Sequence, residues 1–152
     1  MIIPSWLGRF DTPPAKVDVL GKVGQHRCDP VRLSWSLSTS VKQSLKQMDL
    51  TRVRPSELLV IASALRKEGL MSGTALDKIK DFTLDAHGKP GPDLPFNFLG
   101  EVRQGLTVAK AMSRKKGDFA PERLYAEFAM SARGLNYLAA AIKGIRPIDI
   151  YG

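Results

Sequence analysis

The sequence predicts a mainly α-helical protein, a small bundle of about five helices built around a helical hairpin, with an extended N-terminal arm and an extended C-terminal tail. Residues 53–84 contain the start, body and stop signals of two consecutive helices. Apolar residues recur every three or four positions in residues 31–48, 96–116 and 124–142. Proline and glycine are concentrated in residues 1–30 and 85–95. We therefore expect an arm over residues 1–30, a helical domain over residues 31–144 with a hinge-like loop at 85–95, and a tail over residues 145–152.

The N-terminal arm combines helix-breaking residues with conspicuous apolar ones. Its prolines and glycines exclude a long helix, and residues 17–23 predict at most a short strand. A disordered tail is usually poor in large apolar residues, so those of the arm need a surface on which to be buried, either on this domain or on a neighbour. The residues expected to bind a partner are Ile3, Trp6, Leu7 and Phe10.

Residues 31–48 predict one amphipathic helix. The apolar positions 33, 37, 41, 45 and 48 fall on one face, and the other positions are mostly serine, threonine, glutamine and lysine. Serine hydroxyls compete for backbone groups, so this helix is expected to depend on packing for its stability. The alternative is a helix that docks on a partner.

Residues 53–84 predict the helical hairpin. Pro55 suits the first turn of a helix, although Arg54 before it is a poor N-cap because a guanidinium group cannot accept hydrogen bonds. Gly69 ends the first helix, and Ser72 is a good N-cap for the second. Together with the later helices, this hairpin predicts a core of Leu58, Ile61, Leu65, Leu76, Ile79, Phe82, Leu99, Leu106, Leu124, Phe128, Leu135 and Leu138.

Two longer helices are predicted in the C-terminal half. Asp93 is the expected N-cap of the first, in which Gly100 and Gly105 weaken the helix unless a second backbone packs closely there. The second carries the longest apolar stripe of the chain, over residues 124–142, which indicates a core position or, alternatively, self-association or a partner helix. The tail that follows supplies three further expected partner-binding residues, Ile148, Ile150 and Tyr151.

Positive charge is unevenly distributed along the chain. The formal net charge is +8, residues 49–93 are neutral, and the excess lies in residues 1–48 and 94–152. This predicts that an acidic partner would meet the N-terminal arm or the C-terminal half, although a basic surface also serves solubility. The candidate contacts for phosphate or an acidic partner are Lys110, Arg114, Lys115, Lys116 and Arg123.

Several functional classes find little support in the sequence. The single cysteine excludes an internal disulfide, and a structural zinc site would lack thiolate ligands. No apolar run approaches the roughly 20 residues of a membrane span, and the first ten residues do not resemble a signal peptide. The expected compartment is the cytoplasm by default, while export by a dedicated secretion machine and incorporation into a particle both stay open.

Enzymatic motifs are not found. The chain contains no GxxxxGK[ST], GxGxxG, HExxH or GxSxG sequence. His26, Cys28 and Asp29 are close in sequence, but a nucleophile and its base usually come from distant segments of a fold. We expect no catalytic residue, no cofactor and no metal.

These observations predict a non-enzymatic protein that binds protein partners or itself, as a subunit or accessory of a larger assembly. The alternative is a nucleic-acid-binding protein that uses its basic C-terminal half. A helix-turn-helix at residues 53–84 is disfavoured because Lys78 and Lys80 are opposed by Asp77 and Asp81 on the second helix. An enzyme is the least favoured class.

Overall fold

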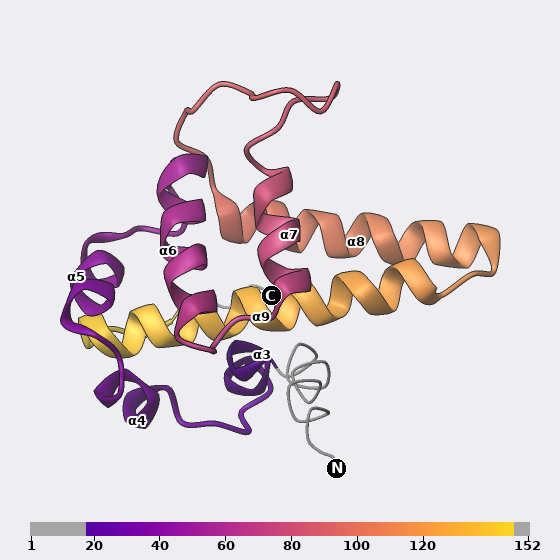
Figure 1. The fold of residues 1–152 in the computed structure, drawn as a ribbon. Helices are drawn as coiled ribbons and strands as arrows, with labels where there is room; N and C mark the ends of the chain where they lie inside the picture. Colours follow the sequence, from indigo (N-terminus) through magenta and orange to yellow (C-terminus); the bar gives the residue numbers. More distant parts are fainter. Residues whose placement is uncertain (1–17, 148–152) are drawn as a thin grey trace, which may run out of the picture.

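The computed structural model of the protein describes residues 18–147. The arm residues Ile3, Trp6, Leu7 and Phe10 and the tail residues Ile148, Ile150 and Tyr151 lie outside this range. The prediction of a mainly helical protein is confirmed, since residues 18–147 form helices without a strand (Figure 1). The helices are α3 (Val19–Gly24), α4 (Pro30–Trp35), α5 (Thr39–Gln47), α6 (Pro55–Lys67), α7 (Gly73–Asp81), α8 (Phe98–Lys116) and α9 (Ala120–Lys143).

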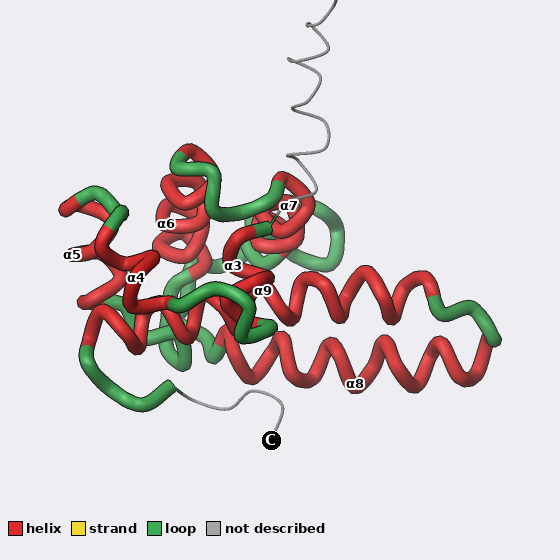
Figure 2. Tube along the Cα trace, turned by 90° about the horizontal axis from the view of Figure 1, so that it is seen from below, coloured by secondary structure: helices red, strands yellow, loops and turns green. Residues whose placement is uncertain are grey.

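The last helix, α9, is the element against which most others pack. It contacts α3, α4, α5, α7 and α8, and it runs along the whole molecule in Figures 1 and 2. The helices α6 and α7 contact each other and stand across the direction of α9 (Figure 1). The predicted arrangement, with the bundle built around residues 53–84, is therefore not confirmed.

An unexpected helix replaces the end of the predicted arm. The extended arm is wrong for residues 18–30, because α3, the loop after it and the first residue of α4 occupy them. The short strand predicted at residues 17–23 is wrong for the described residues 18–23, which begin and form α3. Asp18 begins α3 by accepting a hydrogen bond from the Gly21 N–H, at 3.0 Å. Leu20 and Val23 are then 0% and 1% exposed. This segment belongs to the core because a single helical turn places both apolar side chains toward α9.

The contact between α3 and α9 depends on two glycines. A Cβ atom on Gly134 of α9 would lie 1.7 Å from the carbonyl oxygen of Leu20, and one on Gly24 of α3 would lie 2.1 Å from that of Met130. Both distances are far inside van der Waals contact, so any side chain at either position would push the helices apart. Backbone packs on backbone here.

The predicted helix over residues 31–48 is divided in two. Helix α4 ends at Trp35, where the hydroxyls of Ser34 and Ser36 donate to carbonyls of the preceding turn. Ser38 then begins α5 by accepting from the Val41 N–H at 3.4 Å. The serine-rich composition explains the break, because these hydroxyls satisfy backbone groups that a continuous helix would use. This break and the added α3 account for the difference from five helices.

At the start of α6, a carboxylate from a distant part of the chain compensates for the poor N-cap predicted at Arg54. The carboxylate of Asp93 accepts from the Ser56 N–H at 2.9 Å and from its hydroxyl at 2.6 Å, and Arg54 donates to the Asp93 carbonyl at 2.9 Å. Asp93 therefore caps α6. The sequence prediction that Asp93 caps the following helix is wrong. Helix α8 is capped instead by Asn97, whose side-chain oxygen accepts from the Gly100 N–H at 2.9 Å.

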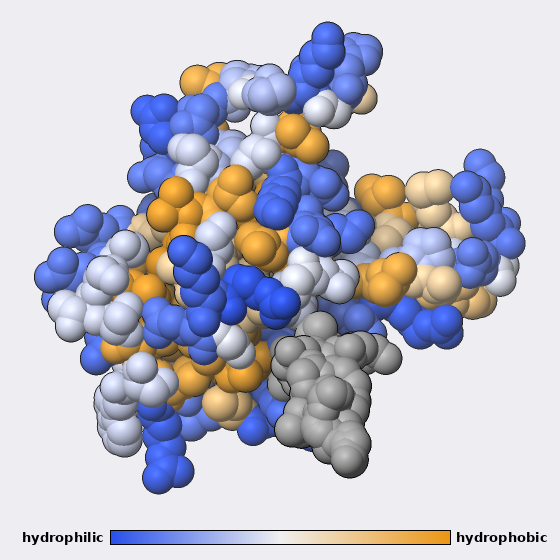
Figure 3. All heavy atoms as spheres, viewed as in Figure 1, coloured by the Kyte–Doolittle hydropathy of each residue, from blue (hydrophilic) through white to orange (hydrophobic). Residues whose placement is uncertain are grey.

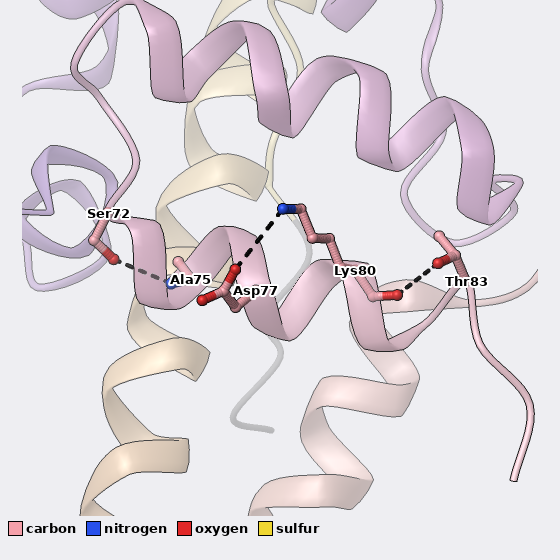
Figure 4. A network of polar contacts seen from close by, with 5 residues as sticks. All are labelled: Ser72, Ala75, Asp77, Lys80 and Thr83. Atoms are coloured by element: carbon pink, nitrogen blue, oxygen red, sulfur yellow. Dashed lines mark hydrogen bonds and ion pairs between the residues drawn. The ribbon is translucent and has the colours of Figure 1, made fainter. Parts of the chain in front are cut away.

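Several polar contacts of α7 are local (Figure 4). Ser72 accepts from the Ala75 N–H at 3.1 Å, and Thr83 donates to the Lys80 carbonyl at 2.6 Å. The Lys80 ammonium lies 3.9 Å from the Asp77 carboxylate. The charges of this helix are thus balanced within one turn.

One apolar core joins the helices. An aromatic group lies at its centre, where the fully buried ring of Phe98 is 5.6 Å from Phe82 and 6.2 Å from Phe128, between centroids. Most of the predicted core residues are buried, but Leu76 and Phe82 are only partly buried. Leu124 is 54% exposed and its prediction as a core residue is wrong. None of the helices in residues 18–147 has the length and apolarity to cross a membrane.

Candidate functional site

The helices α8 and α9 form a projection. They lie side by side and extend beyond the other helices at one end of the molecule, as both views show (Figures 1 and 2). Gly117, with φ of 72°, ends α8 in the left-handed conformation and turns the chain back. The carboxylate of Asp118 then accepts from the Ala120 N–H at 3.0 Å, which begins α9.

A groove lies where the projection meets α7. It has a volume of about 710 Å³ and is lined by side chains from α7, α8 and the first turns of α9. Val108 and Met112 of α8 are 50% and 46% exposed, and Leu124 of α9 is 54% exposed. Hydrophobic side chains are visible on the projection among hydrophilic ones (Figure 3). The groove therefore presents apolar surface that the rest of the described chain leaves uncovered.

Two hydroxyl groups are placed in this apolar lining. Ser113 is 2% exposed, and within residues 18–147 its Oγ is buried without a hydrogen-bond partner. Tyr125 is partly buried, and the pKa of its phenol is raised by burial and by the nearby Glu101 carboxylate. The phenol thus stays protonated at neutral pH. Each hydroxyl can donate and accept a hydrogen bond.

Gly105 allows Tyr125 to lie across α8. A Cβ atom at position 105 would be 2.0 Å from the Tyr125 Oη and 2.3 Å from its Cζ. The close approach expected at this glycine is therefore made by a side chain and not by a second backbone. The ring also contacts Phe128 edge-on, with centroids 5.7 Å apart. Tyr125 connects the wall of the groove to the aromatic core.

The predicted basic residues lie on the projection, but only one of them lines the groove. Lys116 is part of the lining, together with Lys78 of α7, Glu101 and Asp118. The remaining predicted contacts are exposed on α8 and α9, and they are Lys110, Arg114, Lys115 and Arg123. Residues 108–124 carry five basic and two acidic side chains. The end of the projection is therefore positively charged.

A second recess has a structural explanation. It has a volume of about 560 Å³ and contains the Asp18 carboxylate, which accepts hydrogen bonds from the hydroxyls of Ser72, at 3.2 Å, and Ser131. These contacts join α3, α7 and α9. Each oxygen of Asp18 is occupied in this way or by the Gly21 N–H, so the carboxylate holds three helices together.

The segment with His26, Cys28 and Asp29 is also used structurally. The His26 ring stacks on Tyr137 of α9, with centroids 5.3 Å apart. The Asp29 carboxylate accepts from the Val31 N–H at 3.0 Å and so begins α4. Within residues 18–147, no group of three or more histidine, cysteine, aspartate or glutamate side chains is placed to hold a metal ion.

Three residues of the groove did not emerge from the sequence. Val108 and Met112 are four positions apart on α8 and away from the buried stripe of Val102 and Leu106, so an apolar pair off the core stripe was the available signal. The orphan hydroxyl of Ser113 had no signal in sequence, because serine is ordinarily an exposed residue.

Comparisons of the chain with family models, with curated proteins and with solved structures found no match.

Proposed function

We propose that this protein is a non-enzymatic interaction or assembly protein that binds a protein partner in the groove of the α8–α9 projection. The observation that carries the proposal is the set of exposed apolar side chains around one recess, Val108, Met112 and Leu124, with a buried Ser113 hydroxyl that has no hydrogen-bond partner within residues 18–147. Single exposed apolar residues are ordinary on protein surfaces, whereas several that line one recess mark a contact surface.

The free energy gained by covering these apolar side chains would be large enough to support binding of a partner. Complete burial of a valine, leucine or methionine side chain is worth about 1.5–3 kcal/mol. These three side chains are about half exposed, so covering them would contribute roughly 2–5 kcal/mol before the costs of association. That is enough to anchor a partner and leaves the remainder to polar contacts at the rim.

The shape suits a helical partner. Val108 and Met112 are one turn apart on α8, and Leu124 is on the neighbouring helix α9, so apolar side chains of two helices line the groove. A helix laid in such a groove inserts side chains at positions i, i+3 or i+4, and i+7. The apolar arm and tail residues, from Ile3 to Phe10 and from Ile148 to Tyr151, are proposed as additional contacts in an assembly.

Nucleic-acid binding has less support. The Lys80–Asp77 pair leaves α7 without a net positive face. The exposed apolar side chains among the cations of the projection are mostly aliphatic, with Phe119, 48% exposed, as an aromatic one, whereas single-stranded nucleic acid favours several aromatic stacking surfaces.

Site-specific photo-cross-linking tests the proposal. A benzophenone amino acid is placed at Met112 in the groove and, as a matched control, at Thr107, which is also exposed on α8 but does not line the groove. In cells that produce the protein, position 112 should yield a discrete protein adduct that position 107 does not. Introducing Val108→Glu should remove that adduct while helix content is unchanged. Equal adducts from both positions, or none from position 112, would refute the proposal.

A further inference from the structure

We infer that the occupant of the groove is an acidic amphipathic helix of another protein and not a second copy of this chain. The inference rests on the proposed function and names the chemistry of the partner. It is drawn from the charge of the projection, from the arrangement of the apolar side chains and from the buried Ser113 hydroxyl.

The charge of the projection favours an acidic partner over a second copy of this chain. Residues 108–124 carry five basic and two acidic side chains, and the chain as a whole has a formal net charge of +8. Two copies that met through this surface would bring the cationic ends of their projections together, which opposes association. A partner with carboxylates flanking its apolar face has the complementary sign.

The positions of individual cations define where those carboxylates would lie. Lys116 lines the groove near its outer end and Lys78 lines it from α7. Both are lysines with flexible stems, so they can follow a carboxylate on either flank of a bound helix. Glu101 and Asp118 also line the groove, so the lining itself is balanced and the exposed Lys115 beside it adds to the positive side.

The Ser113 hydroxyl adds a polar requirement. Its Oγ is buried without a partner among residues 18–147, in a groove whose lining includes the apolar side chains of Val108, Met112 and Leu124. A hydroxyl can donate to a carboxylate or to an amide oxygen. We therefore place one glutamate or glutamine within the apolar stripe of the partner helix, at the position that lies over Ser113.

Synthetic helices provide the probe. The first is a helical peptide of about 18 residues with leucines at i, i+3, i+4 and i+7, one central glutamine and glutamates on both flanks. The second has the same leucines and glutamine with lysine in place of each glutamate. The third keeps the glutamates and replaces the leucines by serine. Binding to the full-length protein is measured by fluorescence anisotropy at low and high salt, and the mass of the protein alone is measured by light scattering.

At low salt, the first peptide is expected to bind at least about tenfold more tightly than either of the others. Its advantage over the lysine peptide should shrink as salt is added. Met112→Glu should abolish this binding, whereas Thr107→Glu should not. Ser113→Ala should weaken the glutamine peptide more than a peptide with leucine at that position. The Ser113 variant removes one atom and is expected to fold normally.

Other results overturn the inference. Equal binding of the glutamate and lysine peptides would remove the electrostatic argument. A dimer that Met112→Glu dissociates would identify a second copy as the occupant. If a DNA oligonucleotide displaced the peptide, and Met112→Glu did not affect binding of the DNA, the projection would be a phosphate-binding surface. If no peptide binds while cross-linking at position 112 still captures a protein, the inference fails and the proposed function stands; if both fail, neither stands.

Discussion

Replacing Gly134 by alanine tests the contact on which α3 depends. The new Cβ atom would lie 1.7 Å from the carbonyl oxygen of Leu20 and 2.6 Å from its carbonyl carbon. Both are backbone atoms, so no side chain can rotate away to relieve the clash. Separating the Cβ atom and the oxygen to a tolerable distance requires α3 and α9 to move apart by about 1.3 Å or more.

The cost follows from what α3 buries. Leu20 and Val23 are 0% and 1% exposed, and full burial of each is worth about 1.5–3 kcal/mol. Alanine recovers about 1 kcal/mol because glycine is a poor residue inside a helix. Allowing for partial retention of these contacts, Gly134→Ala should lower the free energy of unfolding by roughly 2–5 kcal/mol.

The measurement is urea unfolding followed by circular dichroism and tryptophan fluorescence. The midpoint should fall by roughly 1–2 M urea. Gly21→Ala is the matched control, because it lies in α3 and its Cβ atom would meet the nearest atom, the Asp18 Cβ, at an ordinary 3.5 Å. This control should leave stability unchanged or raise it. Gly24→Ala should act like Gly134→Ala, and the double variant should lose less than the two losses added together, since α3 is displaced only once.

An unchanged or higher midpoint for Gly134→Ala, with an unchanged slope, would refute this reasoning. It would mean that α3 does not approach α9 at the distance described. Loss of stability in Gly21→Ala equal to that of Gly134→Ala would also contradict it, because the effect would then belong to glycine in general and not to the helix crossing.

Two further predictions concern polar and aromatic contacts. Hydrogen bonds from the Ser56 hydroxyl and N–H lower the pKa of Asp93, so its ionised form stabilises the fold above the ordinary carboxyl pKa of about 3.9, and this contribution is lost as pH falls through the lower folded pKa. Asp93→Asn should therefore lower the melting temperature at neutral pH, and the difference from wild type should shrink below about pH 4; a constant difference across that range would contradict the assignment. Gly105→Ala should destabilise by roughly 1–3 kcal/mol through its clash with Tyr125. Tyr125→Leu should restore part of that loss in the double variant, and strictly additive losses by urea unfolding would show that the two residues are not in contact.

Local signals in the sequence were read correctly where the chain interacts with itself over a few residues. Ser72 caps α7, and Gly69, in the left-handed conformation, follows the end of α6 as predicted. The helical periodicity of the apolar residues predicted the helical class and most of the core. These features depend on hydrogen bonds and side-chain spacing within one or two helical turns, so neighbouring residues suffice to specify them.

The misread features depend on residues distant in sequence. Asp93 caps α6 from 37 positions away, and Leu124 belongs to a regular apolar stripe yet is exposed because α9 extends past the helices that would cover it. The importance of Gly134 also depends on the fold. In the sequence it is one small residue among the alanines of α9, and only the packing of α3 places the Leu20 carbonyl against it.

The candidate site likewise has one feature that the sequence predicts and one that only the fold shows. A basic end of the C-terminal half was readable from sequence because charge depends on composition. Its combination with Val108, Met112 and the buried hydroxyl of Ser113 in one groove was not, since it requires the positions of α7, α8 and α9 together. Sequence specifies which helices form and which residues are apolar or charged; the three-dimensional packing of those helices sets which apolar residues are covered, and the uncovered ones are what a partner can bind.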